Sequence, residues 1–162
     1  MMKKRWISLF VENDIGVLAK IAGLFSGKSY NLDSLTVGTT EDSTVSRMTI
    51  SLTSDDKTFE QVKKQLNRSV EVIKVVDYTD VAVHSKELMF VKISSCSERD
   101  MEEIFRISQV FDVTVIDYLP SSVLIESVQT EECNNQFITL LEKCYANRFE
   151  IVRGGSVAME FG

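Results

Sequence analysis

The sequence predicts an α+β protein that contains two successive βαββαβ units. Short runs in which apolar and polar residues alternate are typical of half-buried strands. Between them lie runs with apolar residues at helical spacing, preceded by residues that favour a helix start. The order of these runs in the first half recurs in the second half of the 162 residues. We therefore expect two ferredoxin-like modules in tandem, each with two helices on one face of a four-stranded antiparallel sheet.

The first half opens with a clearly alternating strand, in which Ile7, Leu9 and Val11 point to one face. An amphipathic helix follows, and a polar turn then joins two strands in a hairpin. The expected elements are strand 5–11, helix 17–26, strands 32–37 and 45–53, a helix capped from residues 54–56, and strand 70–76.

The second half repeats this order after a mixed connector. The expected elements are strand 88–93, a helix that starts at residues 97–100, strands 113–118 and 123–128, a helix capped by Thr130, and strand 149–152. Gly154 and Gly155 are expected to break the chain before an extra strand at 157–161. Cys133 and Cys144 share a helical face with Phe137, so we expect both in the core.

The domain boundary is predicted near Ser85. An N-terminal domain at residues 1–77 is followed by a linker at 78–86 and a C-terminal domain at 87–162. Each unit has fewer than about 80 residues, a size at which a single domain is marginally stable. The uncovered sheet face and the strand edges favour contact with the other module or with another chain, so we expect an oligomer.

Charge and composition exclude several classes of function. The net charge of −6 argues against nucleic-acid binding, because a phosphate backbone requires clustered Lys and Arg. No apolar run is long enough to span a membrane and no signal peptide is recognised, so a cytoplasmic protein is expected. Three cysteines at no metal-like spacing and a single histidine, His84, predict neither a disulfide framework nor a metal site.

The sequence contains no arrangement of residues typical of a catalytic site. One histidine excludes most histidine dyads and metal triads, and no P-loop, GxGxxG or GxSxG motif is present. Strand 45–53 lacks the aromatic residues that an RNA-binding sheet requires. Ligand binding is therefore favoured over an enzyme on a ferredoxin-like scaffold.

The strand-to-helix turn at residues 12–19 is the favoured binding site. Asn13 and Asp14 suit an N-cap, and Gly16 leaves room for a ligand or a second backbone. The first turn of such a helix presents free N–H donors and a partial positive charge, which suit a phosphate or a carboxylate. The alternative is an ordinary strand–helix connection whose glycine only relieves the turn.

A second segment, residues 30–32, could complete this site only in a pair of modules. The two segments lie at opposite ends of the predicted helix, about 15 Å apart for ten residues. Between two modules, a free amino acid could face its carboxylate to the N–H groups of residues 16–18. Its ammonium would then meet the side-chain oxygen of Asn13 or Asn31. Its side chain would lie against one or more apolar residues: Ile15, Val17, Leu18 or Leu32. The alternative is that Asn31 is a turn residue and Leu32 belongs to the core.

Four segments carry a family resemblance: Glu12-Asn13-Asp14-Ile15-Gly16-Val17-Leu18, Gly23-Leu24-Phe25-Ser26, Tyr30-Asn31-Leu32-Asp33-Ser34-Leu35-Thr36-Val37 and Ser46-Arg47-Met48-Thr49-Ile50. Together they resemble the regulatory (small) subunit of acetolactate synthase, also called acetohydroxyacid synthase. The likeness to that family's ACT domain covers nearly all of residues 3–77. Residues 91–94, 115–117 and 151–158 resemble its C-terminal domain more loosely.

The resemblance implies a homodimer whose ACT domains pair side by side and bind a branched-chain amino acid, chiefly valine, between them. The implied ligand positions are Asn13, Asp14, Ile15, Gly16, Val17 and Leu18 of one chain with Asn31 and Leu32 of the other. The family's small subunit activates a separate catalytic subunit and confers feedback inhibition on it, in the synthesis of valine, leucine and isoleucine. Thiamine diphosphate, FAD and magnesium belong to that partner, and no cofactor is expected in this chain.

The sequence departs from the family pattern at Ser29, where glycine is usual, near Phe111 and Asp112, where a basic residue is missing, and at an acidic C-terminus. The alternative to a regulatory subunit is a stand-alone ACT-domain sensor of amino acids that has no catalytic partner.

Overall fold

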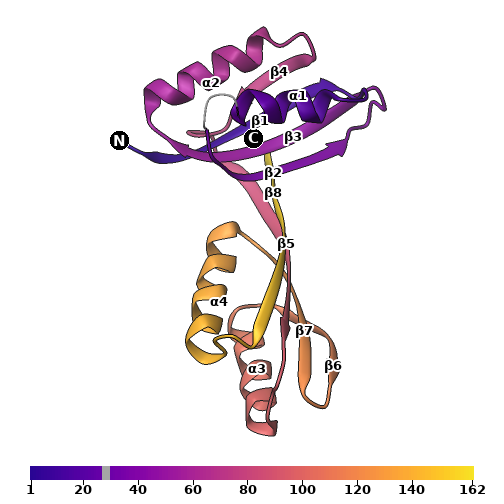
Figure 1. Cartoon of the computed structure of the whole chain (residues 1–162), viewed down its shortest axis with the longest axis vertical. Coiled ribbons are helices and arrows are strands. Elements are labelled where there is room, and N and C mark those ends of the chain that lie inside the picture. The colour runs from indigo at the N-terminus through magenta and orange to yellow at the C-terminus, as the bar shows by residue number, and fades with distance from the viewer. Residues whose placement is uncertain (27–29) are drawn as a thin grey trace. The chain divides into compact units, whose positions relative to one another are not determined.

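The computed structural model describes residues 1–26 and 30–162, which form two four-stranded antiparallel sheets with helices (Figure 1). The first sheet has the strand order β2-β3-β1-β4 and the second the order β6-β7-β5-β8. The first six elements are β1 (Lys3–Glu12), α1 (Val17–Ser26), β2 (Leu32–Thr39), β3 (Val45–Ser54), α2 (Asp56–Arg68) and β4 (Val72–Asp77). The remaining six are β5 (Val83–Ile93), α3 (Glu98–Val110), β6 (Thr114–Leu119), β7 (Ser122–Gln129), α4 (Glu131–Cys144) and β8 (Phe149–Glu160). The predicted pair of βαββαβ units is therefore confirmed.

The chain divides into two compact units. The first contains Met1–His84 together with Val157–Gly162, and the second contains Ser85–Ser156. Strand β8 runs without a break through Gly154 and Gly155, so the predicted interruption there is wrong. Glycine is favoured at both positions, because a Cβ at position 154 would lie 3.3 Å from the carbonyl oxygen of Leu88 and Gly155 has a φ of 80°.

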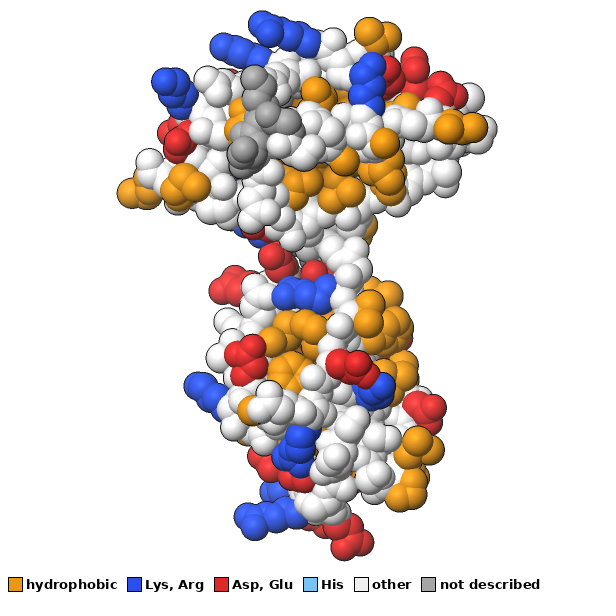
Figure 2. Space-filling model, in the orientation of Figure 1, with side chains coloured by type: hydrophobic (Ala, Val, Ile, Leu, Met, Phe, Trp, Pro, Cys, Tyr) orange, Lys and Arg blue, Asp and Glu red, His pale blue; other side chains and the backbone are white. Residues whose placement is uncertain are grey.

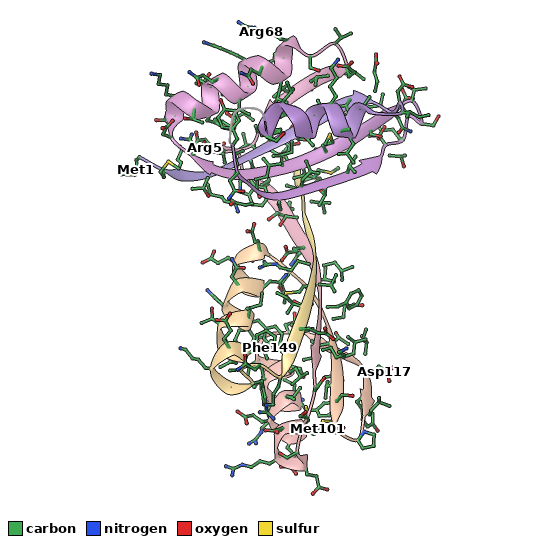
Figure 3. All side chains as sticks on the ribbon, in the orientation of Figure 1. Met1, Arg5, Arg68, Met101, Asp117 and Phe149 are labelled. Carbon is green, nitrogen blue, oxygen red and sulfur yellow. The ribbon has the colours of Figure 1, made fainter. Side chains whose placement is uncertain are left out.

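The core of the first unit lies between its sheet and helices α1 and α2. Ile7, Leu9 and Val11 on β1 all point into it, as their alternation predicts. Helix α2 is capped by Asp55, whose carboxylate accepts a hydrogen bond from the backbone N–H of Thr58. At the same end of α2, the buried guanidinium of Arg5 is paired with Asp56 (Figure 3). This pair joins the first strand to the helix that covers it.

The core of the second unit lies between its sheet and helices α3 and α4. The inward face of α4 carries Asn134, Phe137 and Leu141, while Cys133 and Cys144 are exposed, so their predicted burial is wrong. The face is shifted because the amide of Asn134, and not the thiol of its neighbour, meets buried polar groups. Tyr145, at the helix end, belongs to the buried core, whereas its neighbour Cys144 is exposed.

A buried polar network ties four elements of the second unit together. Glu87 on β5 has only 3% of its surface exposed and accepts hydrogen bonds from Arg153 on β8, the shortest at 2.7 Å. Glu87 also accepts from the side chain of Asn134 at 2.9 Å, and the Asn134 carbonyl oxygen accepts from the hydroxyl of Ser127 on β7 at 2.6 Å. Each of these four side chains thus has a hydrogen-bond partner within the network, as a low-dielectric interior favours.

Candidate functional site

The loop between β1 and α1 places Gly16 at the start of the helix. Gly16 has a φ of 85°, and its carbonyl oxygen accepts the first helical hydrogen bond, from the N–H of Lys20 at 3.0 Å. Gly16 is therefore the N-cap residue, because the N-cap carbonyl accepts that first bond. Val17 is buried and anchors the helix, while residues 12–16 are exposed.

The structure corrects the predicted capping role of Asn13. Its backbone N–H donates to the carbonyl oxygen of Thr44 at 2.8 Å, and its side-chain Nδ2 donates to that of Ser43 at 3.0 Å. Asn13 therefore fastens the loop to the turn between β2 and β3. Asp14 contributes its carbonyl oxygen, which accepts from the N–H of Val17 at 3.4 Å.

Asp55, Ser97 and Thr130 cap α2, α3 and α4, respectively, whereas no side chain among the described residues caps α1. Within residues 1–26 and 30–162, no acceptor forms a hydrogen bond with the backbone N–H groups of Leu18 and Ala19. These donors, with the positive end of the helix dipole, can bind a carboxylate.

Apolar side chains lie beside these donors. Ile15 is fully exposed and Leu18 is partly exposed on the outer side of α1, whereas Val17 points into the core. Of the predicted apolar contacts in the loop, Ile15 and Leu18 are accessible to a ligand. Val17 can contribute only its backbone.

Asn31 and Leu32 lie at the other end of α1. The N–H of Tyr30 donates to the carbonyl oxygen of Phe25 at 3.1 Å, which holds this segment beside the last turn of the helix. The ten residues of α1 therefore separate it from Gly16 by about 15 Å. Asn31 is exposed, and Leu32 packs partly against the core. A single chain does not bring the two predicted parts of the site together.

The turn that holds Asn13 was not predicted as part of the site. Asp42 accepts hydrogen bonds from the hydroxyl and the backbone N–H of Thr44, at 2.7 and 2.9 Å. The hydroxyl of Thr44 in particular holds the pKa of Asp42 below its usual value. The spacing Thr40-Glu41-Asp42-Ser43-Thr44 is typical of a side-chain-stabilised turn and could have identified this support.

In the described part of the chain, no three or more His, Cys, Asp or Glu side chains are grouped to hold a metal ion. No helix in the same residues combines the length and apolar character needed to cross a bilayer.

Comparison with known proteins identifies the family. Residues 7–74 match the AHAS small subunit-like ACT domain, and residues 86–162 match the family described as the small subunit of acetolactate synthase. The acetolactate synthase small subunit of Aquifex aeolicus is 40% identical over 98% of this chain and 81% of its own length. The chain belongs to the acetolactate synthase small subunit family.

Other members of the acetolactate synthase small subunit family agree with this assignment. The small subunit of acetolactate synthase isozyme 3 from Escherichia coli is 35% identical over 98% of this chain and 96% of its own length. The crystal structure of the acetolactate synthase small subunit from Thermotoga maritima covers 99% of this chain, and this chain covers 98% of it, with a TM-score of 0.84 and 32% identity. The resemblance in both halves is thus confirmed, and Ser29, one of the departures, lies outside the described residues.

Proposed function

We propose that this chain is the regulatory, non-catalytic subunit of an acetolactate synthase and that it senses a branched-chain amino acid, chiefly valine, between two paired ACT domains. The observation that carries the proposal is the separation of the two halves of the site along α1. Since one chain cannot close the site, a second copy must supply the other half.

Pairing of two copies through β2 would supply that half. Strand β2 is an edge strand of the first sheet, with only β3 beside it. In an antiparallel pair related by a two-fold axis, the start of one β2 lies next to the end of the other. The turn that follows β2 holds Asn13 and hence the β1–α1 loop. Asn31 and Leu32 of one copy would therefore approach residues 13–18 of the other.

The chemistry of this cleft fits a small apolar amino acid. Its carboxylate would accept hydrogen bonds from the uncapped N–H groups at the start of α1. Its ammonium would donate to the side-chain oxygen of Asn13, whose Nδ2 is already used to bind Ser43, or to that of Asn31. The aliphatic side chain would pack on Ile15, Leu18 and Leu32.

The partner in this proposal is the catalytic subunit, which would hold thiamine diphosphate, FAD and magnesium. Both subunits would act in the cytoplasm. The small subunit would activate it and, with the amino acid bound, inhibit it. Feedback of this kind needs a coupling free energy of only ~1–3 kcal/mol between the two sites.

Calorimetric titration of the purified chain with valine, leucine and isoleucine tests the sensing claim. We expect heat of binding with at least one of them and a dimer in sedimentation analysis. Absence of heat with all three would remove the proposed site. A parallel assay of the catalytic subunit with and without this chain tests the regulatory role. A chain that binds valine but leaves that activity unchanged would be a stand-alone sensor.

A further inference from the structure

The side-chain amide of Asn13 is held in one orientation. Its Nδ2 donates to the carbonyl oxygen of Ser43 at 3.0 Å, and its backbone N–H donates to that of Thr44 at 2.8 Å. An amide rotated by a half turn would bring Oδ1 to the Ser43 carbonyl oxygen, where two acceptors repel each other and no hydrogen bond forms. The Nδ2 group of Asn13 therefore belongs at the turn between β2 and β3.

The turn that orients this amide is itself held by side chains. The carboxylate of Asp42 accepts hydrogen bonds from the hydroxyl and the backbone N–H of Thr44, at 2.7 and 2.9 Å. The hydroxyl of Thr40 lies 2.9 and 3.0 Å from the carbonyl oxygens of Asp42 and Val45, and it accepts from the N–H of Asp42 at 3.2 Å. The Ser43 carbonyl therefore has a fixed direction, because the turn is bonded on both sides of it.

The oxygen of the Asn13 amide has no donor in the described chain. No group of residues 1–26 and 30–162 donates a hydrogen bond to Oδ1, and the side chain is exposed. A ligand group that faces Oδ1 must be a donor, since an acceptor placed there would be repelled and would lose its own hydrogen bonds to water. An ammonium is the best such donor, because hydrogen bonds that involve a charged group are stronger than neutral ones.

The charges beside this amide have the sign that an ammonium requires. The loop at residues 12–16 and the turn at residues 40–45 contain no Lys or Arg and four exposed carboxylates, those of Glu12, Asp14, Glu41 and Asp42. Lys20, the basic residue of α1, forms an ion pair with Glu71 at 2.5 Å. In Figures 1 and 2 the loop and the turn lie at the same end of the first unit, where acidic side chains gather. The hydrogen bond to Oδ1, and not this charge, carries the selection argued below.

An amino acid and its 2-oxo acid differ at the group that would face Oδ1. Both have the carboxylate that the proposed site would bind at the start of α1 and the aliphatic side chain that would pack on Ile15 and Leu18. The 2-oxo acid has a carbonyl oxygen in place of the ammonium, so it would present an acceptor to an acceptor. A site built to hydrogen-bond one group of its ligand rejects the analogue that lacks this group.

We propose that Asn13, oriented by the β2–β3 turn, makes this site select the free ammonium group of an α-amino acid and reject the 2-oxo acid of the same carbon skeleton. Asp42 and Thr44 act as positioning residues, because they fix the turn that orients the amide. This inference rests on the proposed function and adds the group of the ligand that the site recognises.

Calorimetric titration of the unaltered chain with valine and with 3-methyl-2-oxobutanoate, the 2-oxo acid with the carbon skeleton of valine, tests the selection. We expect the oxo acid to bind at least about tenfold more weakly, the loss that corresponds to one hydrogen bond to a charged group. The ratio of the two Kd values is the measured quantity, because a loss of stability alone would weaken both ligands equally.

Three variants test the source of this ratio. Asn13→Ala removes Oδ1, and Asp42→Ala removes the acceptor that holds Thr44, so each should lower the ratio at least about threefold. Glu41→Ala is the matched control, since it removes a neighbouring exposed carboxylate that forms no hydrogen bond in the described chain. This control should keep the ratio within about twofold of that of the unaltered chain.

The possible results separate this inference from the proposed function. An unaltered chain that binds none of valine, leucine and isoleucine would overturn both. Binding of valine and its oxo acid within about threefold of each other would overturn the selection and leave the sensing role intact. An unchanged ratio in Asn13→Ala, with a lowered ratio in Asn31→Ala, would assign the acceptor to Asn31 and overturn the role of Asn13. Equal ratios in Asp42→Ala and Glu41→Ala would overturn the role of the turn.

Discussion

Replacement of Gly16 by aspartate tests whether the carboxylate of the bound amino acid lies at the start of α1. The substitution meets no steric obstacle among residues 1–26 and 30–162, since no atom of these residues lies within 4 Å of the position that a Cβ would occupy. The φ of 85° strains an L-residue by ~1–2 kcal/mol, but Asp and Asn tolerate this region best. The variant should therefore fold.

The expected loss of affinity follows from the repulsion of two carboxylates. At a separation of about 4 Å, two like charges repel by ~1 kcal/mol at the dielectric constant of water and ~4 kcal/mol at an effective value of 20. Since 1.4 kcal/mol corresponds to about tenfold, the valine Kd should rise by a factor between about 5 and 1,000.

Gly16→Asn is the matched control, because it has the same shape and the same tolerance of positive φ but no charge. Both variants are compared by calorimetric titration with valine and by thermal unfolding. We expect similar melting temperatures and the stated difference in valine Kd. Equal affinities of the two variants would refute a ligand carboxylate beside the helix start. If both variants bound valine as tightly as the unaltered chain, the ligand site could not lie in this loop.

Three further predictions concern stability. Gly23→Ala should raise the free energy of unfolding by up to ~1 kcal/mol in a urea titration, because Gly23 lies within α1 and a Cβ there meets no described atom within 4 Å. A loss of stability would contradict this prediction. Arg153→Met should lower the free energy of unfolding by ~3 kcal/mol, since the buried carboxylate of Glu87 loses its charged partner, and an unchanged urea midpoint would contradict that role. Tyr145→Phe should keep or raise stability at pH 7, because the buried hydroxyl has no hydrogen-bond partner in the described chain. Burial raises the pKa of Tyr145 to about 12, while the unfolded value is near 10. The unfolded chain therefore loses the phenol proton first, and the free energy of unfolding falls as the pH rises from about 10 to about 12. The Phe variant should lack this fall in alkaline unfolding curves, and identical curves would refute the prediction.

The fold was predictable because most of its helices and strands have a recognisable pattern of apolar residues in the local sequence. The alternation of Ile7, Leu9 and Val11 identified β1 and its buried face, and apolar spacing identified α1 within its observed bounds. The glycines of β8 were misread because glycine marks a break and a close approach between strands equally well. Only the contact of Gly154 with the backbone of Leu88 distinguishes the two.

The site residues stay a prediction, and the contacts that hold the loop in place were not predictable from the sequence. Gly16 and Asn13 stand out in the sequence, yet Asn13 bonds to a turn 30 positions further along the chain, and no local pattern reports such a contact. The Glu87–Arg153 pair spans 66 positions for the same reason. Asn134 rather than Cys133 faces inward because of that distant glutamate. Hydrophobic periodicity does not register polar contacts of this kind.

The two edges of the first sheet give a physical reason why regulation can be built from so small a domain. The proposed site, divided between two copies, would make ligand affinity depend on how the copies are placed, so the ligand would favour one arrangement of the pair. Helix α1 carries the N–H groups of Leu18 and Ala19 that are proposed to bind the ligand and, through Lys20, the bond to Glu71 beside the β4 edge. A displacement of this helix would therefore change contacts near both edges of the sheet. Because coupling is reciprocal, in the proposed complex the catalytic subunit would change valine affinity by the same factor by which valine changes the binding of the catalytic subunit.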